Sequence, residues 1–259
     1  MSAPLLLPLD LAGLGGFCST RQGGVSAGPY ASLNLGANTD DDPALVLANR
    51  RQALELAGLE PRRAVFLQQV HGAVVRQATA ADAGRGWQSW ADGLPGCDAV
   101  YTLERGLGLA IGQADCLVAL LVDQDAACLG LAHVGWRGAL NGIAPALLGR
   151  MVAAGADVAR LKVLLSPCLG PKSLELGEAQ HSTFRSCYPD LRYYSTALVQ
   201  GRFHLDLQAC VRGQLELAGV PAGGIRALEL DTATQAELFF SYRRDRGLTG
   251  RMLTLAWLK

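Results

Sequence analysis

The chain has 259 residues, of which 50% are hydrophobic, so it is long enough and apolar enough to bury a sizeable core. Its 23 lysines and arginines balance its 23 aspartates and glutamates, which removes any global electrostatic attraction to nucleic acid or to an anionic membrane. A local basic pocket is still compatible with this balance, but the apolar runs are far too short to span a bilayer.

The predicted elements of the first half alternate irregularly. Residues 19–30 are dense in glycine and turn formers, which predicts a shaped loop. A helix is expected to begin at Pro43, after the N-cap Asp42, and to end at Gly58. Short strands are expected over 64–69, 99–102 and 107–111, and a β-hairpin over 116–133.

In the second half of the chain, expected helices again alternate with expected strands. A turn over 135–138 should lead into a helix that stops near Gly155, followed by a strand over 161–165. Two more helices are expected over 178–187 and, capped by Asp206, over 207–217. Strands over 225–230 and 252–258 follow. This irregular alternation predicts a mixed-sheet α/β or α+β fold.

The sequence also bears on domain organisation and location. No Pro/Ser-rich linker, charge block or internal repeat divides it, which favours a single domain over residues 1–259. The first charged residue after the N-terminus is Asp10 and the first basic residue is Arg21, so residues 5–7 lack the positive flank of a secretory signal. We therefore expect a cytoplasmic protein. The sequence leaves the oligomeric state open, and a monomer is the simplest expectation.

The hairpin joins two reactive side chains. Apolar residues alternate along both arms, and a polar turn lies between them. If the strands pair symmetrically about Gln124 and Asp125, Cys116 and His133 face each other with Cβ atoms roughly 5 Å apart. This arrangement suits two ligands of one metal ion, or a nucleophile with its base. A bulge in the turn would change the facing pairs. Most of the other six cysteines are expected to be buried as small apolar thiols.

Two of the four histidines, His71 and His133, lie where a strand runs into a glycine-containing loop, and sites are often assembled at such places. A His/Cys/His set with an open fourth position matches a catalytic zinc site, in which zinc lowers the pKa of bound water to about 7. Two imidazoles and a thiolate are also the equatorial ligands of an electron-transfer copper site, so copper is the alternative. His181 and His204 are expected to be structural or exposed.

Arginines supply a second kind of chemistry. Arg21 lies in a glycine-rich loop, and Arg137 follows closely after His133. Guanidinium groups and backbone amides of glycine loops commonly hold phosphate. Three further arginines crowd one segment near the C-terminus: Arg243, Arg244 and Arg251. An isolated surface arginine more often only solvates the protein.

Short motifs along nearly the whole chain carry a further signal. They are STRQGGVS (19–26), YASLNLG (30–36), QVHG (69–72), ADC (114–116), AHVGWRG (132–138), FFSYRRD (239–245) and TGRM (249–252). In this order they resemble the YfiH/laccase-domain family, whose members are described as purine nucleoside phosphorylases and formerly bore the name polyphenol oxidase. Three positions depart from its pattern: Val134 replaces Ala, LELG (174–177) replaces Tyr-Glu-Val-Gly, and Asp231-Thr232 replaces Cys-Thr.

The resemblance implies a zinc ion held by His71, Cys116 and His133. It also implies phosphorolysis of adenosine, inosine, guanosine and methylthioadenosine, together with hydrolytic deamination of adenosine. The implied fold is a mixed β-sandwich with helices outside, similar to that of bacterial toxins with a Cys-His deamidase site. The expected partners are therefore a purine nucleoside and phosphate, without nucleic acid or membrane.

Roles for other residues follow from this chemistry. In deamination, zinc-bound hydroxide would attack C6 of the purine while a carboxylate moves the proton, and the candidates are Asp98, Asp115 and Glu175. In phosphorolysis, phosphate would attack C1′ of the ribose, with charge stabilised by preorganised donors. The residues expected to bind substrate or phosphate are Arg21, Asn34, Arg137 and Arg243.

Three rival functions stay open. Cys116 would be the thiolate nucleophile of an amidase, with His133 or His71 as its base. Family members are also linked to quality control of cell-wall precursors, so the substrate of this amidase would be such a precursor. A copper-dependent polyphenol oxidase would need oxygen, whereas phosphorolysis does not. A metal-stabilised partner protein would have no nucleoside activity.

Overall fold

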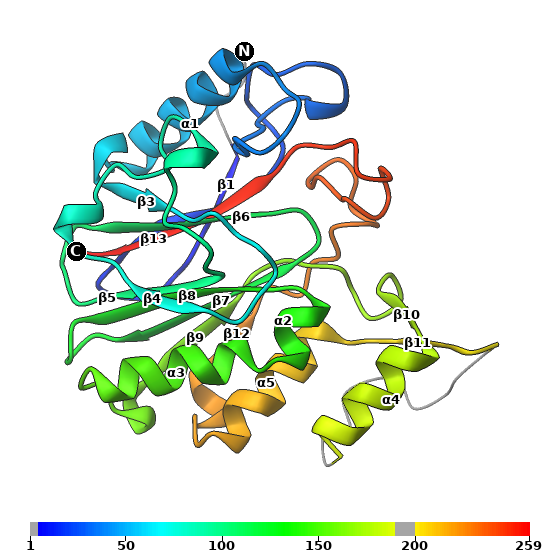
Figure 1. Cartoon of the computed structure of the whole chain (residues 1–259). Helices are drawn as coiled ribbons and strands as arrows, with labels where there is room; N and C mark the ends of the chain where they lie inside the picture. The colour runs from blue at the N-terminus through cyan, green and yellow to red at the C-terminus, as the bar shows by residue number, and fades with distance from the viewer. Residues whose placement is uncertain (1–4, 190–199) are drawn as a thin grey trace.

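The computed structural model describes residues 5–189 and 200–259. Two β-sheets stack face to face, and helices cover both outer faces (Figure 1). Helix α1 (Pro43–Ala57) packs on one sheet. The other sheet is covered by α2 (Trp136–Leu140), α3 (Ile143–Ala153) and α5 (Leu207–Leu217). The predicted mixed β-sandwich flanked by helices is confirmed.

The sheets are mixed and draw on distant parts of the chain. In spatial order, the five-stranded sheet contains β1 (Leu6–Pro8), β2 (Leu14–Ser19), β13 (Met252–Leu258), β6 (Gly108–Gln113) and β3 (Ala64–Phe66). The six-stranded sheet contains β12 (Ile225–Ala227), β9 (Lys162–Leu165), β7 (Leu117–Asp123), β8 (Cys128–Val134), β5 (Ala99–Thr102) and β4 (Val75–Gln77). A separate antiparallel pair, β10 (Glu175–Gly177) and β11 (Arg202–His204), lies beside α4 (Glu178–Cys187).

The central strand β7 shows why the core sequence is apolar on both faces. Val118 and Leu120 point into the space between the sheets, where they pack with residues of β6 such as Leu109. The alternate residues Leu117 and Ala119 point towards the covering helices. Because every residue of β7 is buried, the strand reads as a continuous apolar run ending in one polar residue.

The register of the hairpin differs from the prediction. Val118, and not Cys116, faces His133, so the predicted facing pair is wrong. The connection spans residues 124–127 instead of two central residues, and Ala127 adopts a left-handed φ of 47°. Cys116 lies just before β7, diagonal to His133. A register shift by an even number of residues keeps side chains on the same face of a sheet. The thiol and the imidazole therefore remain neighbours.

Other predictions were confirmed or corrected. Helices α1, α4 and α5 have the predicted bounds, and the Asp42 and Asp206 side chains cap α1 and α5. The helix predicted up to about 154 ends at Ala153, as expected, but it is not continuous from residue 138, because Gly142 at φ 67° separates α2 from α3. Residues 136–138, predicted as part of a turn, begin α2. Strands β3 and β12 end earlier than predicted. Within the described residues, no helix combines the length and the apolar character needed to cross a bilayer.

Candidate metal centre

Three side chains converge where the ends of the two sheets meet. His71, Cys116 and His133 each offer one ligand atom, and these atoms lie within 4.8 Å of one another. The two imidazole rings meet edge to face, with centroids 4.9 Å apart. Zinc binds sulfur and nitrogen at about 2.0–2.3 Å, so the three atoms need to close in only slightly to share one ion. The donor set and its spacing therefore fit a single metal ion.

Each ligand is placed by a local backbone feature. His71 lies in the loop after β3 and adopts φ 58°, and Cys116 follows Asp115, which adopts φ 85°. Gly135 leaves room for the thiol, since a Cβ atom at this position would lie 3.0 Å from Cys116 Sγ. The loop of His71 is tied to β6 by Gln69, whose amide exchanges two hydrogen bonds with the backbone of Gly112.

A single carboxylate organises two of the three ligands. Asp98 is fully buried, and its Oδ1 lies 2.9 Å from His133 Nδ1. The backbone N–H groups of Val70, His71 and Gly72 also donate to Asp98. A carboxylate that accepts from Nδ1–H fixes the imidazole tautomer and leaves Nε2 free to bind a metal. The structure thus gives this predicted proton carrier an orienting position behind the ligands.

The electrostatics favour the ligand form of the thiol. Burial alone would raise the pKa of Cys116, but the attraction of His133 and His71 outweighs it and lowers this pKa to about 6. Burial would lower the pKa of His133, but Cys116 and Asp98 raise it to about 9. The thiolate is the form of cysteine that binds metals and attacks electrophiles. The arrangement therefore favours the thiolate form of Cys116 and the protonated form of His133.

The cluster opens into a cavity of about 720 Å³. Part of its lining is apolar: Trp136, Leu169, Leu174 and Leu207. Another part is polar: Asn38, Gln69, Gln113, Tyr242, Arg137, Arg243 and Arg251. Apolar and aromatic groups suit the faces of a flat ring, and guanidinium groups suit an anion. The cavity thus combines a metal cluster with surfaces for a mixed apolar and anionic ligand.

Two of the predicted phosphate residues line this cavity. Arg137 is exposed, and its guanidinium lies over the ring of Trp136 at 4.4 Å. Arg243 is also exposed, and its Nη1 donates to the backbone oxygen of Glu175 at 3.2 Å. Against residues 5–189 and 200–259, most of their N–H donors therefore remain available to a ligand.

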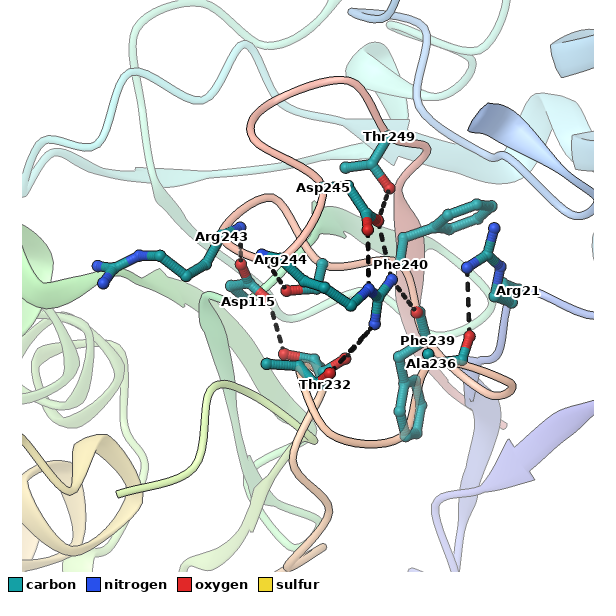
Figure 2. Close-up of polar contacts among 12 residues, drawn as sticks. Arg21, Asp115, Thr232, Ala236, Phe239, Phe240, Arg243, Arg244, Asp245 and Thr249 are labelled. Atoms are coloured by element: carbon teal, nitrogen blue, oxygen red, sulfur yellow. Dashed lines mark hydrogen bonds and ion pairs between the residues drawn. The ribbon is translucent and has the colours of Figure 1, made fainter. Parts of the chain in front are cut away.

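Arg21, also predicted to bind phosphate, does not line the cavity. Figure 2 shows it beside Ala236 and Phe240. Its Nε donates to the Ala31 oxygen and its Nη1 to the Ala236 oxygen, and the guanidinium lies over the Phe240 ring at 4.5 Å. Burial, followed by the nearby Arg244, lowers its pKa. Arg21 thus joins the N-terminal loop to the segment before β13.

Asn34 is likewise placed outside the cavity. Its amide is fully buried and donates to Thr39 and Asp41, and its oxygen accepts from the backbone N–H groups of Gly36 and Arg251. Both ends of the side chain are occupied. Its contribution to the site is to anchor the backbone of a residue that does line the cavity.

The other carboxylate candidates are also engaged. Glu175 lies outside the cavity lining and pairs with Arg202 at 2.8 Å. Asp115 lines the cavity, but its two oxygens accept hydrogen bonds from the Thr232 hydroxyl and the Arg243 backbone N–H (Figure 2).

Several cavity residues were not assigned a role from the sequence: Asn38, Gln69, Gln113, Tyr242 and Arg251. Arg251 donates from Nη1 to the oxygens of Thr249 and Gly250, and lies 5.5 Å from the Tyr242 ring. These residues lie in loops or at strand ends, where no periodicity marks them. These residues lie within or beside the short sequence motifs, and this position could have indicated that they belong to the site.

These features define a candidate metalloenzyme built on a helix-flanked β-sandwich. Residues 16–259 match the family described as "Multi-copper polyphenol oxidoreductase laccase", and the chain belongs to this YfiH/laccase-domain family. The resemblance noted from the motifs is thereby confirmed.

Solved structures agree with this assignment. The crystal structure of YlmD from Geobacillus stearothermophilus is 37% identical, has a TM-score of 0.92, and the match covers 96% of this chain and 93% of that chain. A Bacillus licheniformis structure described as hypothetical protein YfiH is 28% identical, with a TM-score of 0.94 and coverage of 100% and 97%.

Relatives with a functional name are also similar along most of their length. "Purine nucleoside phosphorylase YlmD" of Geobacillus stearothermophilus is 39% identical over 246 residues, which cover 91% of this chain and 86% of that protein. "Purine nucleoside phosphorylase YfiH" of Escherichia coli is 36% identical over 250 residues, which cover 95% and 94%.

Proposed function

We propose that this chain is a purine nucleoside phosphorylase whose metal is held by His71, Cys116 and His133. The observation that carries the proposal is that one cavity contains both the three-ligand cluster and several guanidinium groups. The names of the similar proteins from Geobacillus and Escherichia support the same activity. Zinc is the metal we propose, with copper as the alternative, because an open His/Cys/His set is typical of catalytic zinc.

The reaction requires phosphate to be bound and oriented and the purine to be held away from water, and the cavity has residues for each of these. A phosphate oxygen forms a bond to C1′ of the ribose while the bond from C1′ to purine N9 breaks, and the purine leaves with the electron pair. Arg137 and Arg243 would bind phosphate, which concentrates it and orients it for attack. The apolar groups Leu169, Leu174 and Leu207 would hold the purine and exclude water, which would otherwise compete with phosphate.

The metal and its support have separate roles. A zinc ion in this position supplies a Lewis acid that polarises an oxygen and stabilises negative charge. Asp98 keeps the proton on His133 Nδ1, so that Nε2 stays turned towards the cluster. The same carboxylate fixes the loop of His71, so both imidazoles are preorganised.

The substrates that we propose are adenosine, inosine, guanosine and methylthioadenosine. Deamination of adenosine is the less supported part, because it needs a carboxylate that can move a proton. Asp98 is buried behind the ligands, Asp115 already accepts two hydrogen bonds, and Glu175 pairs with an arginine. The geometry therefore supports phosphorolysis more strongly than deamination, and release of ammonia from adenosine tests the second activity separately.

The proposal is tested with purified protein and inosine. Elemental analysis should find about one zinc per chain, and hypoxanthine should appear only when phosphate is added. Cys116→Ser should lose both metal and activity, whereas Cys187→Ala, which changes an exposed cysteine elsewhere, should keep both. Protein that holds its metal but leaves inosine intact in the presence of phosphate would refute the phosphorylase.

One observation favours a second function. Cys116, His133 and Asp98 form a thiol–imidazole–carboxylate series, with the thiol sulfur within 4.8 Å of an imidazole nitrogen and the carboxylate 2.9 Å from His133 Nδ1. This arrangement suits a Cys-His amidase acting on a cell-wall precursor. Chelation discriminates between the two, because an amidase should keep its activity on a muropeptide precursor after metal removal, whereas the phosphorylase should lose its own.

A copper-dependent polyphenol oxidase is the third candidate, favoured by the description of the family and by a donor set that also suits copper. An assay without oxygen separates it from phosphorolysis, which consumes none. Hypoxanthine release that persists under anaerobic conditions would support the phosphorylase.

A further inference from the structure

A fully engaged arginine lies at the centre of the loop before β13 (Figure 2). The Arg244 guanidinium donates to the backbone oxygens of Thr232, Ala233 and Phe239, and to both carboxylate oxygens of Asp245. A guanidinium has five N–H donors, and these five hydrogen bonds use all of them. Arg244 therefore has no donor left for a ligand, but it holds together three stretches of chain.

The loop that Arg244 organises is attached directly beside a metal ligand. Asp115 precedes Cys116, and its carboxylate accepts from the Thr232 hydroxyl at 2.7 Å and from the Arg243 backbone N–H at 2.6 Å (Figure 2). Both contacts lie close to the atoms that Arg244 binds. The position of the loop relative to the cluster is thus fixed. Asp115 attaches the loop beside Cys116, and Arg244 holds the loop together from inside.

Fixing this loop delivers one guanidinium to the cavity. The side chain of Arg243 extends away from the Arg244–Asp245 pair (Figure 2), and it lines the cavity. Its backbone is held by Asp115, and its Nη1 is held by the Glu175 oxygen. Within the described part of the chain, the Arg243 guanidinium makes one hydrogen bond. Most of its five N–H donors are therefore available to a ligand in the cavity.

The same network reaches a second cavity arginine. Asp245, held by Arg244, accepts a hydrogen bond from the Thr249 hydroxyl at 2.9 Å. The backbone oxygen of Thr249 accepts in turn from Arg251 Nη1 at 2.8 Å. Arg251 is anchored by this oxygen and by that of Gly250, and it is one of the residues that line the cavity. Arg244 is therefore linked to both Arg243 and Arg251 without touching the cavity.

Arg244 also neutralises a carboxylate that would otherwise oppose an anion. Asp245 pairs with Arg244 through both oxygens at 2.8 Å. Without this partner, the Asp245 carboxylate would be free to pair with neighbouring guanidinium groups and would repel phosphate. Loss of Arg244 should therefore weaken anion binding both by loosening the loop and by exposing a competing negative charge.

We infer that Arg244 is a positioning residue for phosphate: it fixes the loop that brings Arg243 and Arg251 to the cavity and keeps Asp245 from competing for them. The inference rests on the proposed function in assuming that the anion bound in this cavity is phosphate. It adds an arginine subsite, Arg243 with Arg251, and a residue outside the cavity that controls it.

The test measures binding of inorganic phosphate by calorimetry, together with KM for phosphate, KM for inosine, and kcat. Arg244→Gln should weaken phosphate binding at least about tenfold and raise KM for phosphate equally, the size expected when charge-assisted hydrogen bonds are lost. KM for inosine and the metal content should change little. The matched control is Arg246→Gln, which makes the same change at an exposed arginine two residues further on.

A double-mutant cycle separates positioning from a general structural effect. If Arg244 acts through Arg243, then Arg244→Gln should weaken phosphate binding much less in an Arg243→Gln background than in the wild-type background. If Arg244→Gln weakens phosphate binding by the same factor in both backgrounds, the proposed coupling is overturned. Should Arg244→Gln fail to fold, Thr249→Val removes only the hydroxyl that links Asp245 to the anchor of Arg251. It should still weaken phosphate binding, and unchanged binding would overturn the inference.

The other outcomes distinguish this inference from the proposed function. A folded Arg244→Gln protein that binds phosphate like the wild type overturns the inference and leaves the phosphorylase intact. Wild-type protein that binds phosphate through these arginines but never cleaves inosine overturns the phosphorylase and supports the subsite. Wild-type protein that binds no phosphate overturns both.

Discussion

At the scale of single residues, the candidate metal centre depends on what stands behind its ligands. Asp98 lies outside the cavity lining, yet it fixes the ring of His133 and the loop of His71. The ligand types could be inferred from the sequence, but this supporting role could not. A buried aspartate and a catalytic one look alike in a sequence, and only the hydrogen-bond partners distinguish them.

Asp98→Asn should lower metal affinity by about 10–100-fold, the usual effect of removing an outer partner of a metal-bound histidine. The amide keeps one acceptor oxygen but cannot accept from all the N–H groups that the carboxylate binds. Competition with a chelator measures the affinity. Asp40→Asn, at an exposed aspartate, serves as control, and equal affinities in all three proteins would show that Asp98 does not support the ligands.

Gly135→Ala should displace Cys116 and reduce bound metal. The φ of Gly135 is −82°, which alanine adopts easily, but its Cβ would lie 3.0 Å from Cys116 Sγ. Gly149→Ala is the matched control, because beyond the backbone of its own helix a Cβ there meets no described residue within 4 Å, and it should leave the metal content unchanged. The readout is the metal-to-protein ratio. Full occupancy in Gly135→Ala would mean that the thiol does not need its present position.

At the scale of elements, predictions succeeded where the signal is local. Helices α1 and α5 are marked by an aspartate cap, and α1 also by the proline at its start. Three-residue strands such as β1, β4 and β10 were missed, because their pairing depends on neighbouring strands more than on their own pattern. The hairpin was found but its register was not, since a symmetric two-residue turn was assumed.

Asp123 explains the longer connection and provides a test of it. The fully buried carboxylate accepts from the backbone N–H groups of Asp125, Ala126 and Asp157, and it pairs with Arg160 at 2.9 Å. Burial would raise its pKa, but Arg160 and the backbone N–H groups of Asp157 and Ala126 lower it. Asp123→Asn should therefore cost about 1–3 kcal/mol of unfolding free energy at pH 7.

The pH dependence of this effect follows from the direction of the shift. A carboxyl whose folded pKa is depressed stabilises the protein above its unfolded pKa of about 3.9, and the stabilisation is lost as pH falls towards the folded value. The stability difference between wild type and Asp123→Asn in urea should thus narrow below about pH 3.9. A difference independent of pH would contradict this linkage. Asp125→Asn, at a carboxylate that is 76% exposed, should change stability little at any pH.

At the scale of the whole molecule, the cluster lies at the junction of the two sheets. His71 lies in the connection from β3 of the five-stranded sheet to β4 of the six-stranded sheet, Cys116 lies in the connection from β6 to β7, and His133 lies in β8. Sequence reasoning could place the last two together from the hairpin. For His71 it had only the residue type and a position at a strand end, and the family resemblance then implied the full ligand set. Arg21 and Asn34 were expected in the cavity, yet the tertiary fold uses their donors for joining loops. Such competition for donors is invisible in a sequence.

A metal that joins the two sheets should stabilise the folded chain. Protein saturated at about 1,000 times Kd gains about 4 kcal/mol from the bound ion. Chelation should therefore lower Tm, and His71→Ala should have a low Tm that a chelator no longer changes. Thermal unfolding with and without chelator measures both. An identical Tm for saturated and chelated wild-type protein would show that the ion does not hold the sheets together.

X-ray absorption spectroscopy of the metal bound to the purified protein tests most directly whether His71, Cys116 and His133 share one ion. We predict a first coordination shell with one sulfur at about 2.3 Å and two imidazole nitrogens at about 2.0 Å. The sulfur contribution should disappear in Cys116→Ser. A shell without sulfur in the wild-type protein, or a sulfur signal that persists in Cys116→Ser, would contradict this ligand set.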